Sequence, residues 1–313
     1  MATPNLSEII TTTLRNRSKS LADNVTNHNA LLRRLSENGN ISTVTGRQIV
    51  RELEYASNST VGFYTGYETL DVSPSDVLTS ATFDYKQMAG NVTISGLEQI
   101  QNSGTEAVIN LLESRIGVLE KSMSNTLSES LYSDGTGTSG KEVGGLQLIV
   151  ADAGSGTVGG INSSTYTFWQ NAQTTATSSA FSTTNIQADM NTIYLSLVRG
   201  SDSPDLIMAD TNSYKSFLGS LQAIQRVTSD RVATSGFTSV QYLNSDVIFD
   251  DACPANKMYF LNTDYLRLEV AANRNFVPGE AKMSVNQDAM VTPMFWSGNL
   301  TCSNRALQGV IHT

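Results

Sequence analysis

The sequence predicts an α+β fold in which one long helix lies on a sheet and a second, α/β unit follows it. Three observations lead to this prediction. Residues 49–95 alternate apolar and polar side chains as extended strands do. Residues 105–131 carry apolar side chains at helical spacing. Residues 185–221 show helix, strand and helix patterns in turn, which is typical of an α/β unit. A chain of 313 residues has room for one large domain or for two to three smaller ones.

The first 45 residues or so are interpreted as an arm rather than as a core segment. They are polar and rich in Asn, Ser and Thr, and only residues 30–35 are amphipathic, which predicts one short helix. Residues 1–50 hold six basic and three acidic side chains, a net charge of +3, whereas the remaining residues carry −12 of the total of −9. A basic arm on an acidic body can lie across another copy of the chain, and a solvated tail is an equally good interpretation.

The next segment predicts a long two-stranded hairpin. Apolar side chains share one parity on each side of a turn-like Ser-Pro-Ser-Asp sequence at 73–76. These side chains are Val61, Phe63 and Tyr67 before the turn and Val77, Ala81, Phe83 and Tyr85 after it. Tyr64 and Leu70 interrupt the alternation before the turn. Because an isolated hairpin is marginal in water, this one needs a surface to lie against.

One apolar stripe predicts a helix over residues 105–131, about 40 Å long at 1.5 Å per residue. Its members are Val108, Leu112, Ile116, Leu119, Met123, Leu127 and Leu131. Thr105 is a plausible N-cap and Gly135 a plausible stop. A single stripe favours packing on a sheet. A coiled coil is the alternative, but most of the intervals are four residues, which does not fit a heptad pattern.

The second half alternates further helices and strands. A buried strand is expected at 145–153, a helix at 185–198, a strand at 204–210 and a short helix at 211–221. Hairpin-like strands are expected after these elements, in residues 240–250, 257–270, 288–296 and 299–311.

Two glycine-rich stretches resemble nucleotide-binding signatures. Residues 135–141 (GTGTSGK) match G-x-x-x-x-G-K, but a helix precedes them, a strand is expected after them, and Glu142 stands where a magnesium-binding Ser or Thr is required. Residues 154–159 (GSGTVG) match G-x-G-x-x-G, but no helical pattern follows, and no acidic residue lies about 20 positions on. Both stretches are therefore interpreted as turns that use glycine for positive φ.

Candidates for other chemistry are few. Cys253 and Cys302 are too far apart in the sequence for a metal motif and are interpreted as unpaired thiols. With His28 and His312 as the two histidines, zinc sites and catalytic triads lack ligands and bases.

The remaining charged candidates also point away from catalysis. Asp250 and Asp251 are adjacent, so in a strand they face opposite sides and do not form a carboxylate pair. Lys86 is interpreted as a solvated amine. We therefore predict no catalytic residues, no cofactor and no metal. The acidic body makes specific nucleic-acid binding unexpected. The sequence shows neither a signal peptide nor an apolar run long enough for a membrane helix, so a soluble protein made in a cytoplasm is expected.

The order of arm, long hairpin, long helix, glycine-rich turn, α/β unit and returning strands resembles the major capsid proteins of tailed bacteriophages. The segment ESLYSDGTGTSGKEVGGLQLIV is similar to the place where that family's spine helix ends in a Gly-Asp-Gly-Thr-Gly turn before a Gly-Leu strand. The matching residues are Asp134, Gly135, Thr136, Gly137, Gly145 and Leu146, and Ser133 departs from the first glycine. The C-terminal segment from residue 266 to residue 311 is similar to the family's last strands.

The resemblance implies the tailed-phage major capsid fold, covers nearly the whole chain, and divides it into five parts. They are an N-terminal arm (1–45), an extended loop (46–97), a peripheral domain with the spine helix (98–165), an α/β axial domain (166–261) and returning strands (262–313). It implies self-assembly into pentamers and hexamers around double-stranded DNA in a virion assembled in the host cytoplasm. The alternative is another self-assembling virion component, a tail-tube or decoration protein.

The resemblance also implies partners. These are further copies of the chain, a portal, cement proteins and, because the arm is short, a separate scaffolding protein or an earlier processing step. Some members crosslink neighbouring subunits through a Lys and an Asn. Lys86 lies in the matching loop, and no partner Asn is assigned. No membrane contact is implied.

Overall fold

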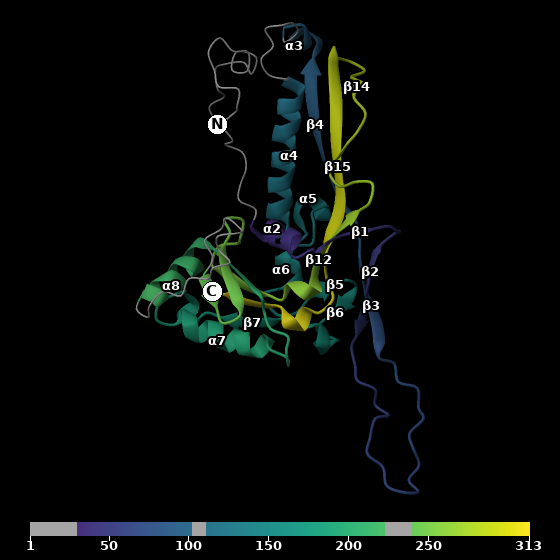
Figure 1. The fold of residues 1–313 in the computed structure, drawn as a ribbon, viewed down its shortest axis with the longest axis vertical. Helices are drawn as coiled ribbons and strands as arrows, with labels where there is room; N and C mark the ends of the chain where they lie inside the picture. The colour runs from purple at the N-terminus through teal and green to yellow at the C-terminus, as the bar shows by residue number, and fades with distance from the viewer. Residues whose placement is uncertain (1–29, 102–110, 223–239) are drawn as a thin grey trace.

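A long helix and a long strand run side by side from one end of the molecule into a broader body, and a thin loop leaves the body at the opposite side (Figure 1). The structure is a computed structural model that describes residues 30–101, 111–222 and 240–313. Its α-helices are α2 (Ala30–Glu37), α3 (Gly96–Gln101), α4 (Leu111–Ser130), α5 (Gly137–Gly140), α6 (Leu146–Ile149), α7 (Ile186–Leu197) and α8 (Thr211–Gln222). Short 3-10 turns lie at Thr167–Trp169, Thr177–Ser179, Thr263–Tyr265 and Arg305–Leu307.

The first sheet is organised around one long strand, β15 (Ala289–Cys302). Its partners are β4 (Lys86–Ser95), β12 (Leu266–Ala271), β13 (Val277–Pro278) and β14 (Lys282–Met283), all antiparallel to it. β1 (Ile41–Val44) adds a parallel strand beside β12. The expected break between the strands 288–296 and 299–311 is therefore wrong, because β15 is one strand from residue 289 to residue 302.

Helix α4 lies along β4, as the apolar stripe predicts for a helix on a sheet. Met123 and Leu127 are buried, while Ile116 and Leu119 pack against the same core. The approach is close at Gly90 of β4, where an added Cβ would lie 2.4 Å from Leu119 Cδ1. The expected helix is confirmed over 111–130, and its first residues, 105–110, lie outside the described residues.

The second sheet has the strand order β7-β16-β11-β8-β10-β9. The strands are β7 (Ala172–Thr175), β8 (Leu206–Ala209), β9 (Val240–Tyr242), β10 (Ser245–Phe249), β11 (Lys257–Leu261) and β16 (Gly309–His312). Pairs β8–β10 and β7–β16 are parallel, and the other pairs are antiparallel. The expected elements at 185–198, 204–210 and 211–221 are confirmed as α7, β8 and α8. The strands expected in 257–270 belong to different sheets, β11 to this one and β12 to the first.

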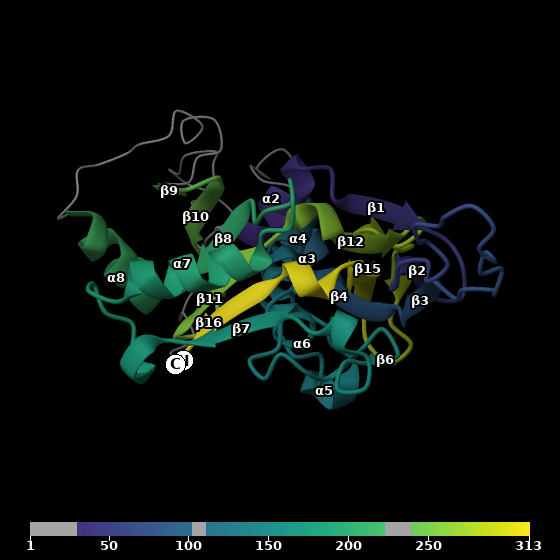
Figure 2. The same ribbon diagram turned by 90° about the horizontal axis from the view of Figure 1, so that it is seen from below.

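The second sheet serves two hydrophobic cores at once. Successive side chains of a strand point to opposite faces. In β11, Met258 and Phe260 join the core under α7 and α8, while Tyr259 and Leu261 join the core that also holds α4 and α6. Figure 2 shows α7 and α8 on one side of this sheet. The body is thus two cores separated by one sheet.

Helix α2 corrects the interpretation of the N-terminal residues as an arm without a core. Ala30, Leu31 and Leu35 are buried in the core that also holds α4 and α6, which we call the main core. The Leu31 backbone N–H donates to Asp250 Oδ2 over 3.3 Å, and Arg34 forms an ion pair with Asp246. The three apolar residues of this short helix pack in the core, while Asp246 of β10 pairs with the Arg34 side chain and Asp250, just after β10, accepts from the Leu31 backbone.

The predicted hairpin is also corrected. β2 (Ile49–Glu54) pairs with β3 (Leu78–Phe83), from Ile49↔Phe83 to Glu54↔Leu78, and the predicted first strand around 61–67 is wrong. Residues 55–77 form no strand, and most of their apolar side chains are exposed. Strand β4 pairs with β15 rather than with β3, so the hairpin itself ends at Phe83.

The buried strand expected at 145–153 is wrong as well, because the segment forms helix α6. Leu146, Ile149 and Val150 are all buried, and a short, continuously apolar run does not discriminate a helix from a strand. Strands β5 (Thr157–Val158) and β6 (Ile161–Asn162) follow as a small hairpin. The division of the chain into five parts stays a prediction.

Candidate assembly surfaces

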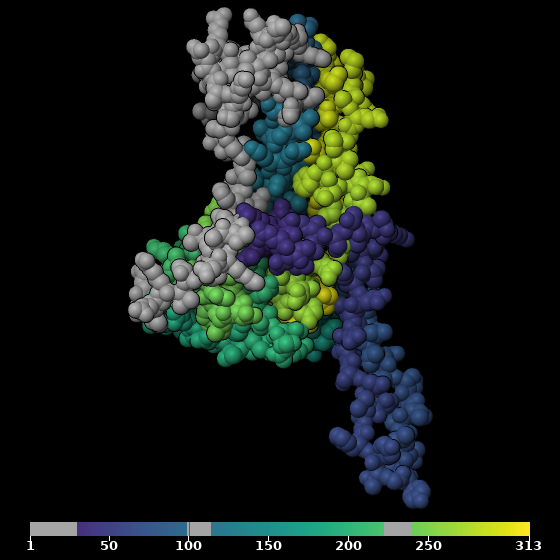
Figure 3. Space-filling model, viewed as in Figure 1, coloured from purple at the N-terminus to yellow at the C-terminus, as the bar shows by residue number. Residues whose placement is uncertain are grey.

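The extended loop, residues 55–77, presents apolar side chains to solvent at the far end of the β2–β3 hairpin. Phe63 and Tyr67 have relative exposures of 108% and 107%, so none of the residues that the structure describes covers them. The exposed large apolar side chains of this loop are Tyr55, Val61, Phe63, Tyr64, Tyr67, Leu70 and Val72. Figure 3 shows the loop projecting away from the body. Apolar side chains gathered in this way mark an interaction surface.

Short polar contacts shape the loop in place of a core. The Ser73 N–H donates to Asp71 Oδ1 over 2.9 Å. Hydrogen bonds from the side chain and the backbone of Ser73 lower the pKa of the Asp71 carboxyl. The Thr60 N–H likewise donates to Asn58 Oδ1 over 2.9 Å. Such local turns set the direction of the backbone without burying apolar area.

The base of the hairpin, by contrast, belongs to the body. Ile49, Leu53, Ala81 and Phe83 are buried in the main core. Arg51 of β2 forms an ion pair with the buried Glu269 of β12 and also contacts Thr301 Oγ1 over 3.3 Å. The hairpin is therefore attached to the first sheet at its base and free at its tip.

A second exposed apolar group lies at the opposite end of the molecule, near the labels α3 and β14 in Figure 1. Leu97, Met283, Val285 and Met290 are exposed there. Met283 and Met290 are register partners in β14 and β15. The two ends of the long axis thus both carry uncovered apolar side chains.

The glycines of GSGTVG form a turn, as the sequence interpretation expects. Gly159 and Gly160 connect β5 to β6 with φ of 59° and 79°, a region that favours glycine. The strand β6 follows them, where a dinucleotide loop would open a helix. The turn lies against β3, since the Thr82 N–H donates to the Gly159 carbonyl over 2.9 Å.

The stretch GTGTSGK is packed against the acidic side chain of the next residue, Glu142. The Glu142 carboxylate lies against Gly137, where an added Cβ would be 2.2 Å from Glu142 Oε2, and it accepts a hydrogen bond of 2.9 Å from Thr138 Oγ1. Gly140 has φ of 76°, and Gly135 has φ of 75°. The stretch thus forms a turn with glycines at positive φ, as the sequence interpretation expects.

Lys86 is not a free amine on the projecting loop. It begins strand β4 and pairs with Gly298 in register. Its Nζ donates to the Gly140 carbonyl over 2.5 Å and so connects the sheet to the glycine-rich turn. The interpretation as a solvated lysine on an extended arm is therefore wrong.

The adjacent acids have different surroundings, but they lie just after β10 and not in a strand, so the alternation of a strand is not the reason. Asp250 is buried and accepts hydrogen bonds from Tyr132 Oη over 2.8 Å and from the Ala252 N–H over 3.0 Å. Burial raises the pKa of Asp250 against these hydrogen bonds. Asp251 is exposed. They form no carboxylate pair.

The sulfur and imidazole candidates are not brought together. Cys253 and Cys302 are free and buried, and burial raises the pKa of Cys302 to about 12, so its thiol stays protonated. His312 Nε2 lies 3.3 Å from Gln173 Oε1, and His28 lies outside the described residues. In residues 30–101, 111–222 and 240–313, no three His, Cys, Asp or Glu side chains gather as a metal site would require. Within the same ranges, no helix combines the length and apolarity needed to cross a membrane.

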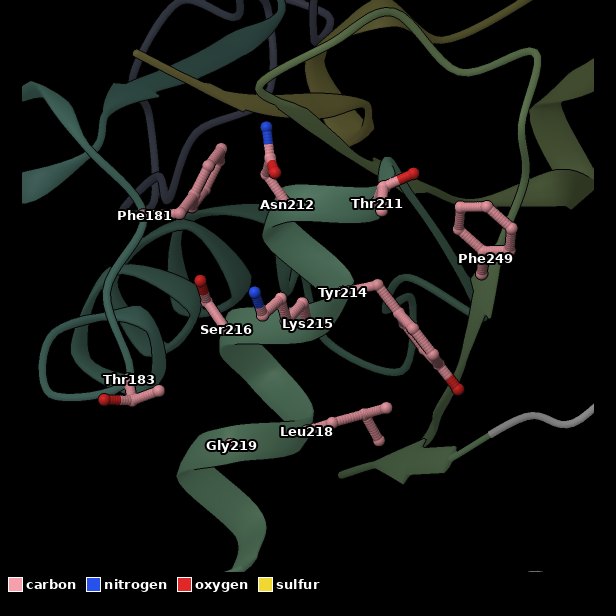
Figure 4. Close-up of a pocket in the computed structure, with 10 residues that line it drawn as sticks. All are labelled: Phe181, Thr183, Thr211, Asn212, Tyr214, Lys215, Ser216, Leu218, Gly219 and Phe249. Atoms are coloured by element: carbon pink, nitrogen blue, oxygen red, sulfur yellow. The ribbon is translucent and has the colours of Figure 1, made fainter.

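A surface hollow of about 740 Å³ lies around helix α8 (Figure 4). Tyr214, Leu218 and Phe249 line one side of it, and Phe181 and Thr183 lie across the helix. Two of its ten lining residues, Tyr214 and Lys215, are titratable, and no carboxylate or imidazole is among them.

Arg305 is a structural residue that the sequence does not reveal. Its side chain is fully buried and donates to Ile149 O over 2.6 Å, to Trp169 O over 3.0 Å and to Asn171 Oδ1 over 2.8 Å. Burial lowers the pKa of its guanidinium to about 10. No spacing marks it, because its partners lie more than 130 residues away in the sequence.

Solved structures with the same fold come from capsid-like shells. The chain matches a chain of the cyanophage A-1(L) capsid asymmetric unit at 17% identity, with 96% of each chain covered and a TM-score of 0.74. It matches a chain of the holo-SrpI encapsulin complex from Synechococcus elongatus PCC 7942 at 10% identity over 99% of this chain and 96% of that one, with a TM-score of 0.64. The capsid of Myoviridae phage XM1 matches at 10% identity over 95% and 96%, with a TM-score of 0.59.

No protein-family profile and no curated protein sequence matches the chain. The match covers 96% of both chains, and this chain contains the long helix on a sheet and the α/β unit that the sequence analysis expects. The predicted fold class is confirmed: the chain has the α+β fold of the tailed-phage major capsid proteins.

Proposed function

We propose that the chain is a major capsid protein, the structural subunit of an icosahedral phage head. The observation that carries the proposal is the extended loop, whose side chains Phe63 and Tyr67 are fully exposed although the base of the hairpin is buried in the core. The full-length likeness to a chain of a cyanophage capsid asymmetric unit supports it.

The loop supplies a physical reason for assembly. A large apolar side chain contributes about 1.5–3 kcal/mol when it passes from water into a packed interface. Two of the loop residues, Phe63 and Tyr67, are wholly exposed and carry the largest such gain. A projecting segment that docks on a different surface of the next copy makes a heterologous contact, and such contacts close into rings when the rotation allows. Pentamers and hexamers follow from this geometry.

The proposal includes the finer features that the resemblance implies. The five-part division of the chain assigns 46–97 to intersubunit contact and 166–261 to the centres of the capsomers. The subunit has no catalytic role, binds no cofactor and encloses double-stranded DNA without specific contacts, which suits an acidic body. A separate scaffolding protein, a portal and cement proteins are its partners, in a virion assembled in the host cytoplasm.

The test is to image the purified chain by negative-stain electron microscopy and to follow light scattering at low and raised concentration. Wild type is expected to form rings of five or six subunits and closed shells. The double variant Phe63→Ser/Tyr67→Ser is expected to keep the wild-type melting temperature but to remain unassembled. Thr65→Ala, a substitution on the same loop, is the control and is expected to assemble.

Two outcomes would contradict the proposal. One is a wild-type chain that stays monomeric at every concentration, and the other is a chain that binds ATP in a titration on the same sample. A chain that coats preformed shells without forming its own would support the decoration-protein alternative instead. Since an encapsulin shares the fold, the contents are tested separately, by sequencing nuclease-protected DNA from particles of the source culture.

A further inference from the structure

The turn between β5 and β6 touches the hairpin where the extended loop leaves the body. The Gly159 carbonyl accepts a hydrogen bond from the Thr82 N–H of β3. In Figure 1 the labels β5 and β6 lie beside β2 and β3, just before the loop becomes free. β3 therefore has β2 along one edge and this turn along the other.

This contact leaves no room for a side chain at one of the two glycines. A Cβ at Gly159 would lie 2.7 Å from Ala81 Cβ and 3.2 Å from Phe83 Cζ. A Cβ at Gly160 would meet nothing closer than Thr82 Oγ1 at 3.5 Å, which is an ordinary contact. Both glycines have positive φ, so they differ in the space around them and not in the need for glycine's backbone freedom.

The hairpin has two attachments that fix its direction. On the β2 side, Arg51 pairs with Glu269. On the β3 side, the turn bonds to Thr82 and packs against Ala81. Residues 52–80 lie beyond these contacts, so each arm is about fourteen residues, or roughly 46 Å when extended. A rotation of about 10° at the base would therefore move the tip by about 8 Å, well beyond contact distance.

We propose that the close contact of Gly159 with Ala81 is a pivot that fixes the angle at which the extended loop leaves the body. The consequence for shell curvature rests on the proposed function. The angle of the loop determines where the next copy docks, so a pivot that shifts by a few degrees changes the size or the uniformity of the particles. Gly159 is in this sense a positioning residue for assembly.

The first test needs no assembly, because it measures hydrogen exchange of the Thr82 amide in chain kept unassembled at low concentration. Gly159→Ala is expected to speed exchange at Thr82 at least tenfold relative to wild type. Gly160→Ala, with the same backbone strain but room for its Cβ, is the matched control and is expected to change exchange less than threefold. The double variant Gly159→Ala/Ala81→Gly is expected to recover most of the protection seen in Ala81→Gly alone.

Equal exchange at Thr82 in Gly159→Ala and Gly160→Ala would overturn the pivot, since backbone strain alone would then explain the effect. Should Gly159→Ala fail to fold, Ala81→Ser enlarges the same contact from the strand side and is expected to speed exchange at Thr82 at least threefold, while no change would again overturn it.

The second test is the diameter distribution of assembled particles by cryo-electron microscopy. Ala81→Ser is expected to shift or broaden it, and Gly160→Ala is expected to keep the wild-type distribution. An unchanged distribution in Ala81→Ser, despite faster exchange at Thr82, would overturn the link to curvature. If wild type forms no shells at all, the proposed function fails, and the exchange experiment still decides on the pivot.

Discussion

The two ends of the β2–β3 hairpin differ in burial and in polar contacts, although they belong to one continuous segment. At the base, Phe83 is 6% exposed and packs in the main core, whereas at the tip Phe63 is fully exposed. Polar contacts at the base reach other elements, as Arg51 does to Glu269, while those of the loop, such as Thr60 to Asn58 and Ser73 to Asp71, stay within the loop itself. The base is built for the stability of one subunit, and the tip has no such role within the chain.

The body should therefore respond to mutation through its free energy of unfolding, with the largest effect at Arg305. Arg305→Met leaves Ile149 O, Trp169 O and Asn171 Oδ1 without their donors in the interior. Buried acceptors left unpaired cost about 1–3 kcal/mol each before relaxation, so a loss of about 4 kcal/mol is expected. Urea denaturation of unassembled chain measures it. Arg267→Met, at an exposed position of β12, is the control and should stay close to wild type.

The sharpest test of the comparison removes the same ring at both ends of the hairpin. Phe83→Ala should cost about 3 kcal/mol, because a buried phenyl group is replaced by a cavity. Phe63→Ala should stay within about 0.5 kcal/mol of wild type in unassembled chain. Denaturation of both variants under identical conditions gives the two values. A cost of more than about 1 kcal/mol for Phe63→Ala would mean that the tip packs on its own chain, and the comparison would then break.

A smaller effect is expected from glycines in the two regions. Gly90→Ala places a Cβ 2.4 Å from Leu119 Cδ1, so α4 must move or Leu119 must change rotamer, at a cost of about 1–2 kcal/mol. Gly62→Ala, in the extended loop, has nothing within 4 Å of its added Cβ and should be neutral. Thermal unfolding of the two variants checks this. Equal melting temperatures would show that α4 and β4 are less tightly packed than described.

The smallest expected effect is a pH dependence that arises at Asp250 in the body. Burial raises the pKa of Asp250 above its ordinary value of 3.8. The folded chain then binds this proton more readily than the unfolded chain does, so the contribution of Asp250 is present at low pH and is lost as the pH rises through the raised pKa.

Replacing Asp250 by Asn should therefore flatten the fall of the unfolding free energy between the ordinary aspartate range and neutral pH. Urea denaturation across that range measures the slope. Asp251→Asn, at the exposed neighbour, is the control and should leave the slope as in wild type. Identical slopes in Asp250→Asn and wild type would contradict this assignment.

The sequence predicts the helices that have one buried face and one exposed face, because their apolar side chains recur at a regular spacing. The stripes of α4, α7 and α8 each lie against a sheet, so helical spacing is sufficient to identify them. Leu146, Ile149 and Val150 of the segment 145–153 are buried, and its apolar run does not distinguish helix from strand. β15 is interrupted by polar residues and Pro293, yet it stays one strand because β4 pairs with its first part, to Gly298, and β12 with the rest.

The candidate site is predictable only in part. Apolar residues of the extended loop stand out in the sequence, but their alternation suggests a strand, because the surface that would cover them is not in the chain. The charge difference between arm and body gives no sign that α2 docks on Asp246 and Asp250, which are distant in the sequence. The glycines of both look-alike motifs are explained by φ and by close approach, which composition alone cannot separate from phosphate binding.

The docking of α2 has a consequence for folding during synthesis of the chain. Leu31 bonds to Asp250, 219 residues later in the chain. A ribosome adding about 5–20 residues per second needs roughly 10–40 s to make that partner. Strand β16 lies between β7 and β11 and is made later still. The extended loop, 55–77, thus leaves the ribosome well before the body that orients it. Nascent chains on one mRNA therefore carry exposed aromatic side chains before the surface on which these can dock has been made.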